Sequence, residues 1–205
     1  MKIFILIISY FLKKIRGIRR RVNEKITINE LLKYNVKFNP SKCYFRGHTY
    51  LDLNKKSNIV IGDYFIANSG VNAGIDCGNG CKIAVQEGAK LIIGRYSGMT
   101  NTIIQCHKEI IIGDYVNIGA GCMIMDSNFH STNWLDRLDR KKDIENHKNA
   151  PIKIEDVVFI GARSIICKGV TIGKHAIIAA GSVVVTDIPE NEVWGGNPAK
   201  FIKKL

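Results

Sequence analysis

The segment from residue 154 to residue 189 reads, in groups of six, Ile154-Glu-Asp-Val-Val-Phe, Ile160-Gly-Ala-Arg-Ser-Ile, Ile166-Cys-Lys-Gly-Val-Thr, Ile172-Gly-Lys-His-Ala-Ile, Ile178-Ala-Ala-Gly-Ser-Val and Val184-Val-Thr-Asp-Ile-Pro. Each group opens with Ile or Val, and its fifth residue is small or β-branched: Val158, Ser164, Val170, Ala176, Ser182 and Ile188. Neither the helix period of about 3.6 nor plain strand alternation produces this spacing. A fixed period of six is typical of a β-helix. We expect three groups to form one triangular coil, with the opening aliphatic side chain inside the prism.

The composition agrees with a single domain built on an aliphatic core. Of 205 residues, 46% are hydrophobic but only 8% are aromatic, and nineteen glycines suit many tight corners. The six cysteines show no paired spacing, although Cys77 and Cys81 would suit half of a metal site. Cys122 falls on the small inward position of its group, where Cys acts as an apolar filler. We therefore expect reduced thiols in a cytoplasmic protein.

The N-terminal end combines an apolar run with a basic cluster. Residues 1–12 are almost entirely apolar, and residues 13–25 hold seven Lys or Arg against one Glu, half of the formal charge of +12. The run is shorter than the roughly 20 residues that span a bilayer. Residues 1–22 are expected either to form a peripheral membrane contact or to pack on an assembly of the protein. Interleaved aromatics and any recognised nucleic-acid module are missing, so we expect no nucleic-acid partner.

The sequence divides into three parts: a helical, basic amphipathic segment at 1–40, a β-helix at 41–190 and a C-terminal tail at 191–205. A second short helix is expected at Ile26–Tyr34, with Thr27 or Asn29 as its cap. The frame of six is regular from Ile112 to Ile124, disappears over residues 126–150 and then returns. Long loops on a rigid scaffold often hold binding and catalytic groups. The excursion loop at 126–150 is therefore where we look for chemistry.

Three segments carry a likeness to known proteins: the repeats from Pro151 to Val184, Gly196-Asn-Pro-Ala-Lys200, and Asp126-Ser-Asn-Phe-His130. They resemble the hexapeptide-repeat acyltransferases, in the branch of maltose and galactoside acetyltransferases and surface-polysaccharide O-acetyltransferases. The likeness covers roughly residues 59–203. It implies an all-β fold, a left-handed parallel β-helix, and a homotrimer with acetyl-CoA between neighbouring prisms. The repeats alone would also fit nucleotidyltransferase tails or carbonic anhydrases, because fold does not fix function.

The resemblance assigns roles to residues in and near the excursion loop. His130 would be the general base, since an imidazole can take a hydroxyl proton near neutral pH and return it to the thiolate. Asp126 is the expected partner that fixes its tautomer, with a backbone carbonyl as the alternative. Asn101 aligns with a residue that contacts acceptor sugar, or else it satisfies its own turn. Asn128 and Trp134 are further candidates for the carbohydrate acceptor, and Trp134 would alternatively hold the loop down.

The positions matched for acetyl-CoA are Gly161, Ala162, Ala180, Gly181, Lys200 and Lys203. Small residues would let the pantetheine arm lie against backbone amides, and the two lysines would meet the phosphates or form a solvated basic tail. One of those amides would also suit an oxyanion. The Rossmann and P-loop fingerprints are absent from the sequence, and no metal is expected.

The sequence thus favours an acetyl-CoA-dependent O-acetyltransferase of a sugar hydroxyl in a surface polysaccharide (capsule, lipopolysaccharide or exopolysaccharide) or its precursor. It would be cytoplasmic, at the inner face of the membrane if the N-terminal segment binds lipid. One alternative is acetylation of a free small molecule, such as a sugar, serine, an antibiotic or a nucleotide-linked amino sugar. A non-enzymatic alternative is a β-helix scaffold or a metal-binding relative.

Overall fold

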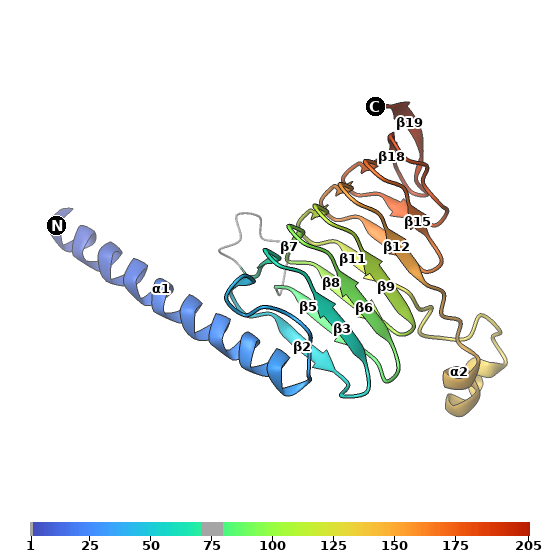
Figure 1. Ribbon diagram of the computed structural model, residues 1–205, viewed down its shortest axis with the longest axis horizontal. Helices are drawn as coiled ribbons and strands as arrows, with labels where there is room; N and C mark the ends of the chain where they lie inside the picture. The colour runs from blue at the N-terminus through green and yellow to red at the C-terminus, as the bar shows by residue number, and fades with distance from the viewer. Residues whose placement is uncertain (1, 71–79) are drawn as a thin grey trace.

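A computed structural model describes residues 2–70 and 80–205, apart from the side chains of residues 2–9, 13 and 16. Cys77 of the suggested half metal site lies outside the described residues. The remainder forms one long N-terminal helix and a triangular prism of stacked strands (Figure 1).

Three sheets, parallel except for the last strand β19, make the faces of the prism, and we number them in the order in which each coil passes through them. Sheet I holds β1 (Tyr44–Arg46), β4 (Ile66–Asn68), β7 (Gly98–Thr100), β10 (Asn117–Ile118), β13 (Phe159–Ile160), β16 (Ile177–Ile178), β18 (Glu192–Gly195) and β19 (Lys200–Lys204). Sheet II holds β2 (Tyr50–Leu53), β5 (Lys82–Val85), β8 (Ile103–Cys106), β11 (Met123–Met125), β14 (Ile165–Cys167) and β17 (Val183–Val184). Sheet III holds β3 (Asn58–Ile61), β6 (Lys90–Ile93), β9 (Glu109–Ile112), β12 (Ile152–Ile154) and β15 (Thr171–Ile172).

The groups of six set the register between coils. Ile112 pairs with Ile154 and Ile154 with Ile172, so equivalent positions lie directly above one another. The six opening aliphatics, from Ile154 to Val184, are all fully buried, and the fifth residues are at most 3% exposed. Cys122 is likewise fully buried. The expected left-handed parallel β-helix, with its aliphatic core, is therefore confirmed.

The outer surfaces of the three sheets differ in character. Sheet III carries ion pairs on its outside, such as Lys90 with Glu109 at 2.7 Å and Lys153 with Glu155 at 2.8 Å. The outward positions of sheet II are mostly apolar and partly exposed: Ile103, Met123, Met125, Ile165, Cys167 and Val183. Charged side chains suit a face in water, whereas an apolar row suits a covered face.

The N-terminal segment is one continuous helix, α1 (Lys2–Lys33), so the expected second helix at Ile26–Tyr34 is wrong. Thr27 does not cap a new helix. Its hydroxyl donates to the backbone carbonyl of Asn23, one turn earlier, at 3.0 Å, which is a bond made inside a continuing helix. Figure 1 shows α1 crossing the base of the prism and projecting beyond it. No helix in the described part of the chain is both long enough and apolar enough to span a membrane.

The prism continues past residue 190, where we expected a tail to begin. Ile188 bridges to Ile172, and β18 pairs with β16 in parallel, which closes a further coil. The chain then reverses, and β19 pairs with β18 in the antiparallel sense. The C-terminal residues are thus part of sheet I.

Candidate active site

The excursion loop leaves the prism between β11 and β12, at the edge where sheets II and III meet. It contains a turn of 3-10 helix, η1 (Asp136–Leu138), and the short helix α2 (Arg140–Asn146). Its two ends are held together, because Ser127 bridges to Asn149 and the N–H of Asn128 donates to the carbonyl of Lys148 at 3.0 Å. The loop is thus a folded unit with a closed base.

Asp126 fastens the start of this loop to the preceding coil. Its side chain is fully buried, and its carboxylate accepts the backbone N–H groups of His107 at 2.6 Å, Lys108 at 2.8 Å and Glu109 at 2.8 Å. A buried carboxylate needs such donors, and these three occupy it. The expectation that Asp126 orients His130 is therefore wrong, and its role is structural.

His130 is paired with Asp143 of α2 instead. Its Nδ1 lies 2.7 Å from Oδ2 of Asp143, while its side chain is 70% exposed. The hydrogen bond with His130, together with one from the N–H of Ser131, lowers the pKa of Asp143. An ionised carboxylate only accepts, so Nδ1 is the donor in this hydrogen bond, and the neutral imidazole then has its free lone pair on Nε2. The imidazole thereby has the form that a general base requires.

The residues on either side of His130 fix its position. Phe129, at φ +62°, packs edge-on against the ring of His107 with centroids 5.2 Å apart. On the other side, the hydroxyl of the buried Ser131 donates to Asp136 at 2.8 Å, and Arg137 donates to the carbonyl of Ser131 at 2.7 Å. These contacts hold the backbone so that the exposed imidazole stands on a rigid support.

Trp134 and Asn128 are both in the loop but differ in placement. Trp134 is 62% exposed, which does not suit a side chain that holds the loop down. Asn128 is half-buried at the closed base, two residues before His130. Their expected contact with a carbohydrate acceptor stays a prediction.

The residues matched for acetyl-CoA line a different edge, where sheets I and II meet. Gly161 and Ala162 lie at one corner, and Ala180 and Gly181 lie directly above them in the next coil. A Cβ atom on Gly161 would come within 2.4 Å of the backbone N of Ala180, so the close stacking of the coils requires glycine there. This glycine is explained by packing whether or not a ligand binds.

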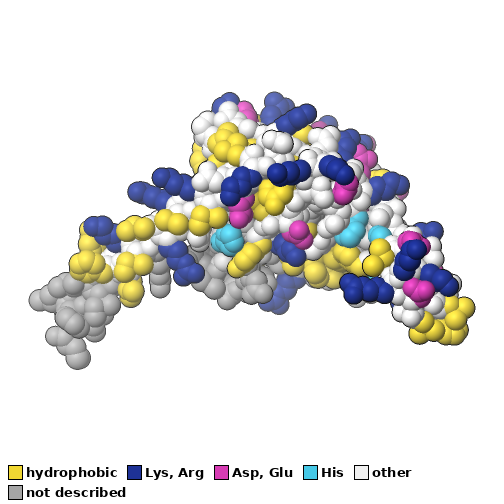
Figure 2. Space-filling model, turned by 90° about the horizontal axis from the view of Figure 1, so that it is seen from below, with side chains coloured by type: hydrophobic (Ala, Val, Ile, Leu, Met, Phe, Trp, Pro, Cys, Tyr) yellow, Lys and Arg dark blue, Asp and Glu magenta, His cyan; other side chains and the backbone are white. Residues whose placement is uncertain are grey.

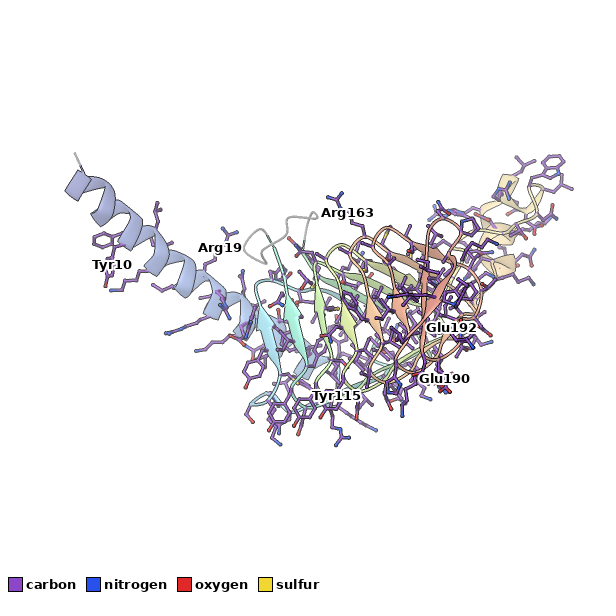
Figure 3. All side chains as sticks on the ribbon, turned by 90° about the horizontal axis from the view of Figure 1, so that it is seen from above. Tyr10, Arg19, Tyr115, Arg163, Glu190 and Glu192 are labelled. Atoms are coloured by element: carbon purple, nitrogen blue, oxygen red, sulfur yellow. The ribbon has the colours of Figure 1, made fainter. Side chains whose placement is uncertain are left out.

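The backbone amides distinguish this edge from its counterpart between sheets III and I. At that other edge, side-chain carboxylates accept the corner amides: Asp114 takes the N–H of Arg95 at 2.7 Å, and Glu155 takes that of Lys174 at 3.2 Å. The amides of Ala162 and Ala180 occupy equivalent corner positions, and neither donates to an acceptor in the described part of the chain. The I/II edge therefore presents free donors to an incoming molecule. Figure 3 shows Arg163, next to these amides, and Tyr115 pointing away from the prism on different sides.

Asn101 lies at the same I/II edge, between β7 and β8. It is 3% exposed at φ +43°, and its side-chain oxygen accepts the N–H of Gly70 at 2.7 Å. Asn101 thus satisfies a backbone amide at the corner of the preceding coil rather than in its own turn, and its expected contact with sugar stays a prediction. A shallow hollow of about 220 Å³ adjoins it on the outside of sheet I, lined in part by Arg46, Asn68, Thr100 and Phe159.

A single chain does not bring these two groups of residues together. The amides and Asn101 follow strands of sheet I, whereas His130 follows a strand of sheet II, so the width of sheet II separates the two edges. A face of six residues measures roughly 20 Å at full extension. Lys200 and Lys203 are exposed on β19 at the C-terminal end of sheet I.

Among the described residues, no group of three or more His, Cys, Asp or Glu side chains could hold a metal ion. His107 and His147 lie with ring centroids 5.9 Å apart at the base of the loop. Burial lowers the pKa of His107, and the neighbouring His147 lowers it further, while Asp126 opposes the shift. Within this pair, the ring of His107 contacts Phe129 and so supports the loop.

Comparison with known proteins finds similarity to enzymes that contain hexapeptide repeats. The model for the hexapeptide repeat of succinyl-transferase matches residues 151–186. The mitochondrial gamma carbonic anhydrase 2 of Arabidopsis thaliana is 33% identical over 177 residues, which cover 78% of this chain and 55% of that protein. A 2,3,4,5-tetrahydropyridine-2,6-dicarboxylate N-acetyltransferase of Clostridium perfringens is 50% identical over 62 residues, 30% of this chain and 26% of the enzyme.

Among solved structures, the chain is similar to the hexapeptide-repeat-containing acetyltransferase VCA0836 from Vibrio cholerae O1 biovar eltor, complexed with acetyl-CoA. The two share 27% identity and a TM-score of 0.54, over 77% of this chain and 70% of that one. The curated relatives are matched over between about a quarter and about half of their own length. With the confirmed repeats, these matches show a chain that is similar to hexapeptide-repeat acetyltransferases and that shares their fold, without selecting a branch among them.

Proposed function

We propose that this protein transfers the acetyl group of acetyl-CoA to a hydroxyl of a carbohydrate, in a surface polysaccharide (capsule, lipopolysaccharide or exopolysaccharide) or its precursor. The observation that carries the proposal is the pair of His130 and Asp143, which leaves Nε2 of an exposed imidazole free as a base. The likeness to an acetyltransferase solved with acetyl-CoA supports the donor.

In the proposed reaction, Nε2 of His130 takes the proton of the acceptor hydroxyl as its oxygen attacks the thioester carbonyl carbon. The carbon–sulfur bond then breaks, and His130 returns the proton to the departing thiolate. Asp143 stabilises the imidazolium that exists between these two proton transfers, because its carboxylate is already 2.7 Å from Nδ1. His130 and Asp143 thus act as base and positioning residue.

The I/II edge fits the pantetheine arm of CoA. The arm contains amide carbonyls, and the free N–H groups of Ala162 and Ala180 are donors of the kind that such carbonyls need. Both residues are alanine, so little side chain stands in the way. The exposed cations Arg163 and Lys200 supply positive charge for the phosphates.

The acceptor is proposed to lie in the hollow on the outside of sheet I. An aromatic face suits a sugar ring, and Phe159 is 48% exposed there. Asn68 and Thr100 offer hydrogen-bonding groups for hydroxyls. Asn101 lies at the adjoining corner, where it shapes the rim through its bond to Gly70.

The reaction requires a second copy of the chain under this proposal. His130 lies at the II/III edge and the CoA wall at the I/II edge, so each working site would combine edges of two neighbours. The apolar outside of sheet II is the face best suited to such a contact. We propose a homotrimer, since three copies around one axis give every edge an equivalent partner.

The donor site is tested by blocking one edge at a time. Replacing Ala180 with Phe should weaken binding of CoA, measured by titration calorimetry, by tenfold or more. The matched control is Lys174→Phe, at the equivalent corner of the III/I edge, and it should leave CoA affinity unchanged. Equal affinities of the two variants, at the same oligomeric mass, would refute the assigned wall.

Two rival functions are favoured by particular relatives. The clostridial N-acetyltransferase favours an amine acceptor, and a panel of sugars and amino acids offering hydroxyls or amines separates the two. The plant relative favours metal chemistry of the carbonic anhydrase kind. Metal analysis of the purified protein, with a hydration assay of carbon dioxide, tests that rival directly.

A further inference from the structure

Among the described side chains of α1, those of its C-terminal turns hold it to the prism. Thr27 and Leu31 are buried against β1 and β2, and Ile28 and Tyr34 pack partly against the core. At about 1.5 Å per residue, residues 2–26 extend for roughly 37 Å beyond this attachment. Most of the described side chains between residues 10 and 26 are therefore open to a partner.

A stripe of apolar side chains runs along this projecting part. Its members are Phe11, Ile15, Ile18, Val22 and Ile26, which are 56%, 57%, 56%, 49% and 41% exposed. They follow one another at intervals of four or three, so they share one face of the helix. We call this row the apolar stripe.

The apolar stripe faces away from the prism. At 100° per residue, Thr27 and Leu31 point to the side of the helix opposite Ile15 and Val22. Because Thr27 and Leu31 face the prism, the stripe is directed away from it; Figure 1 shows the course of α1 beyond the prism. The chain's own prism cannot cover it. In a trimer built around an axis parallel to the prisms, all three stripes would face the same side.

Basic side chains flank the stripe on both sides. Lys14, Arg21 and Lys25 lie along one border, and Arg19 lies along the other. None of them forms an ion pair with any described side chain. Figure 2 shows apolar side chains in a row along α1, with Lys and Arg beside them.

We propose that α1 docks the protein on the surface of an anionic membrane, with the apolar stripe among the acyl chains and the flanking cations on the headgroups. An amphipathic helix with basic borders binds in this manner. Each Lys or Arg near such a surface strengthens binding roughly fivefold. For a cytoplasmic protein, this is the inner face of the membrane.

The charge pattern also decides between two possible partners of the apolar stripe, a membrane surface and a bundle of α1 helices. If the stripe were the seam of a parallel bundle, the flanking positions of neighbouring helices would face one another. Here they would bring Lys14 and Arg21 against Arg19, with like charges throughout. Headgroups of opposite charge remove that repulsion, so the lipid surface is the occupant that fits.

The test is sedimentation of the full chain with vesicles, which needs no enzymatic activity. The protein should bind vesicles that contain phosphatidylglycerol, and binding should weaken with pure phosphatidylcholine or when salt rises from about 0.1 M to about 1 M. Ile18→Asp should lower binding at least tenfold, because it places a charge in the stripe. The matched control is Gly17→Asp, which adds the same charge on the face away from the stripe, where a side chain meets no atom within 4 Å. That variant should keep most of the binding.

Two results would overturn the proposal. One is failure of the wild-type chain to bind anionic vesicles; a change in oligomeric mass with Ile18→Asp in the absence of lipid would then make the stripe a contact between copies. The other is equal binding by the two Asp variants. Neither result depends on whether the protein is an acetyltransferase.

Discussion

The pairing of His130 with Asp143 gives the most specific prediction about the chemistry. Replacing Asp143 with Ala removes the acceptor that lies 2.7 Å from Nδ1 of His130 and leaves the base itself in place. A buried carboxylate that orients a catalytic imidazole is worth up to about 10⁴-fold in kcat. Because the side chain of His130 is 70% exposed, water can replace part of the lost hydrogen bond. We therefore expect kcat to fall about tenfold, with little change in KM for acetyl-CoA.

The assay is release of free CoA thiol from acetyl-CoA in the presence of an acceptor. Glu145→Ala is the control, because it removes a charge from the same helix at a residue whose ion pair is with Lys141 instead. In a His130→Ala background, the Asp143 substitution should have no further effect on kcat. An unchanged rate in Asp143→Ala, or equal losses with and without His130, would refute the role assigned to this carboxylate.

Three further predictions concern stability. Gly161→Ala should destabilise the protein by about 2 kcal/mol and lower its melting temperature by roughly 4–8 °C. The reason is that the new methyl group meets the backbone of Ala180 at 2.4 Å. An unchanged melting temperature would contradict the close stacking of the coils. Gly17→Ala should slow amide exchange in α1, since Ala stabilises an exposed helix interior by roughly 0.5–1 kcal/mol and meets no atom within 4 Å; faster exchange would contradict a continuous helix there. Burial lowers the pKa of His107 from its ordinary 6.5, so its contribution is fully present above that pH and is lost as pH falls through the lowered value. The melting temperature should therefore fall more between pH 7.5 and pH 5.5 for the wild type than for His107→Gln, and equal falls would contradict this assignment.

The fold could be predicted because its signal is local and repeated. Each opening aliphatic, such as Ile154 or Ile172, fills the prism, so the spacing in the sequence is the spacing of the coils. The helix boundary could not be read in the same way. Thr27 has the chemistry of an N-cap, but inside a continuing helix its hydroxyl bonds back to Asn23.

The site was predictable in part. His130 stands out because the frame of six breaks beside it, whereas its partner depends on how the loop folds back. Asp126 is nearer in sequence, yet its carboxylate is taken by the amides of the preceding coil. Asp143 is thirteen residues away and is brought to His130 by α2, whose N-cap is Asp139. No spacing rule selects it among the acidic residues of the loop.

The N-terminal helix illustrates the same limit. The sequence shows an apolar run followed by basic residues, which suits a membrane contact or a helix packed on the protein. Only the attachment of Thr27 and Leu31 to the prism fixes which face of α1 is left open. That geometry, rather than composition, carries the proposal of membrane docking.

The central claim is that His130 is the base of an acetyl transfer from acetyl-CoA to a hydroxyl. It is tested most directly by comparing the wild type with His130→Ala, using acceptor-dependent release of CoA from acetyl-CoA and mass spectrometry of the product. The wild type should form an O-acetyl sugar, and the variant should lose roughly 10²- to 10⁴-fold in kcat while binding acetyl-CoA normally. Full acceptor-dependent thioester cleavage by the variant would contradict the claim.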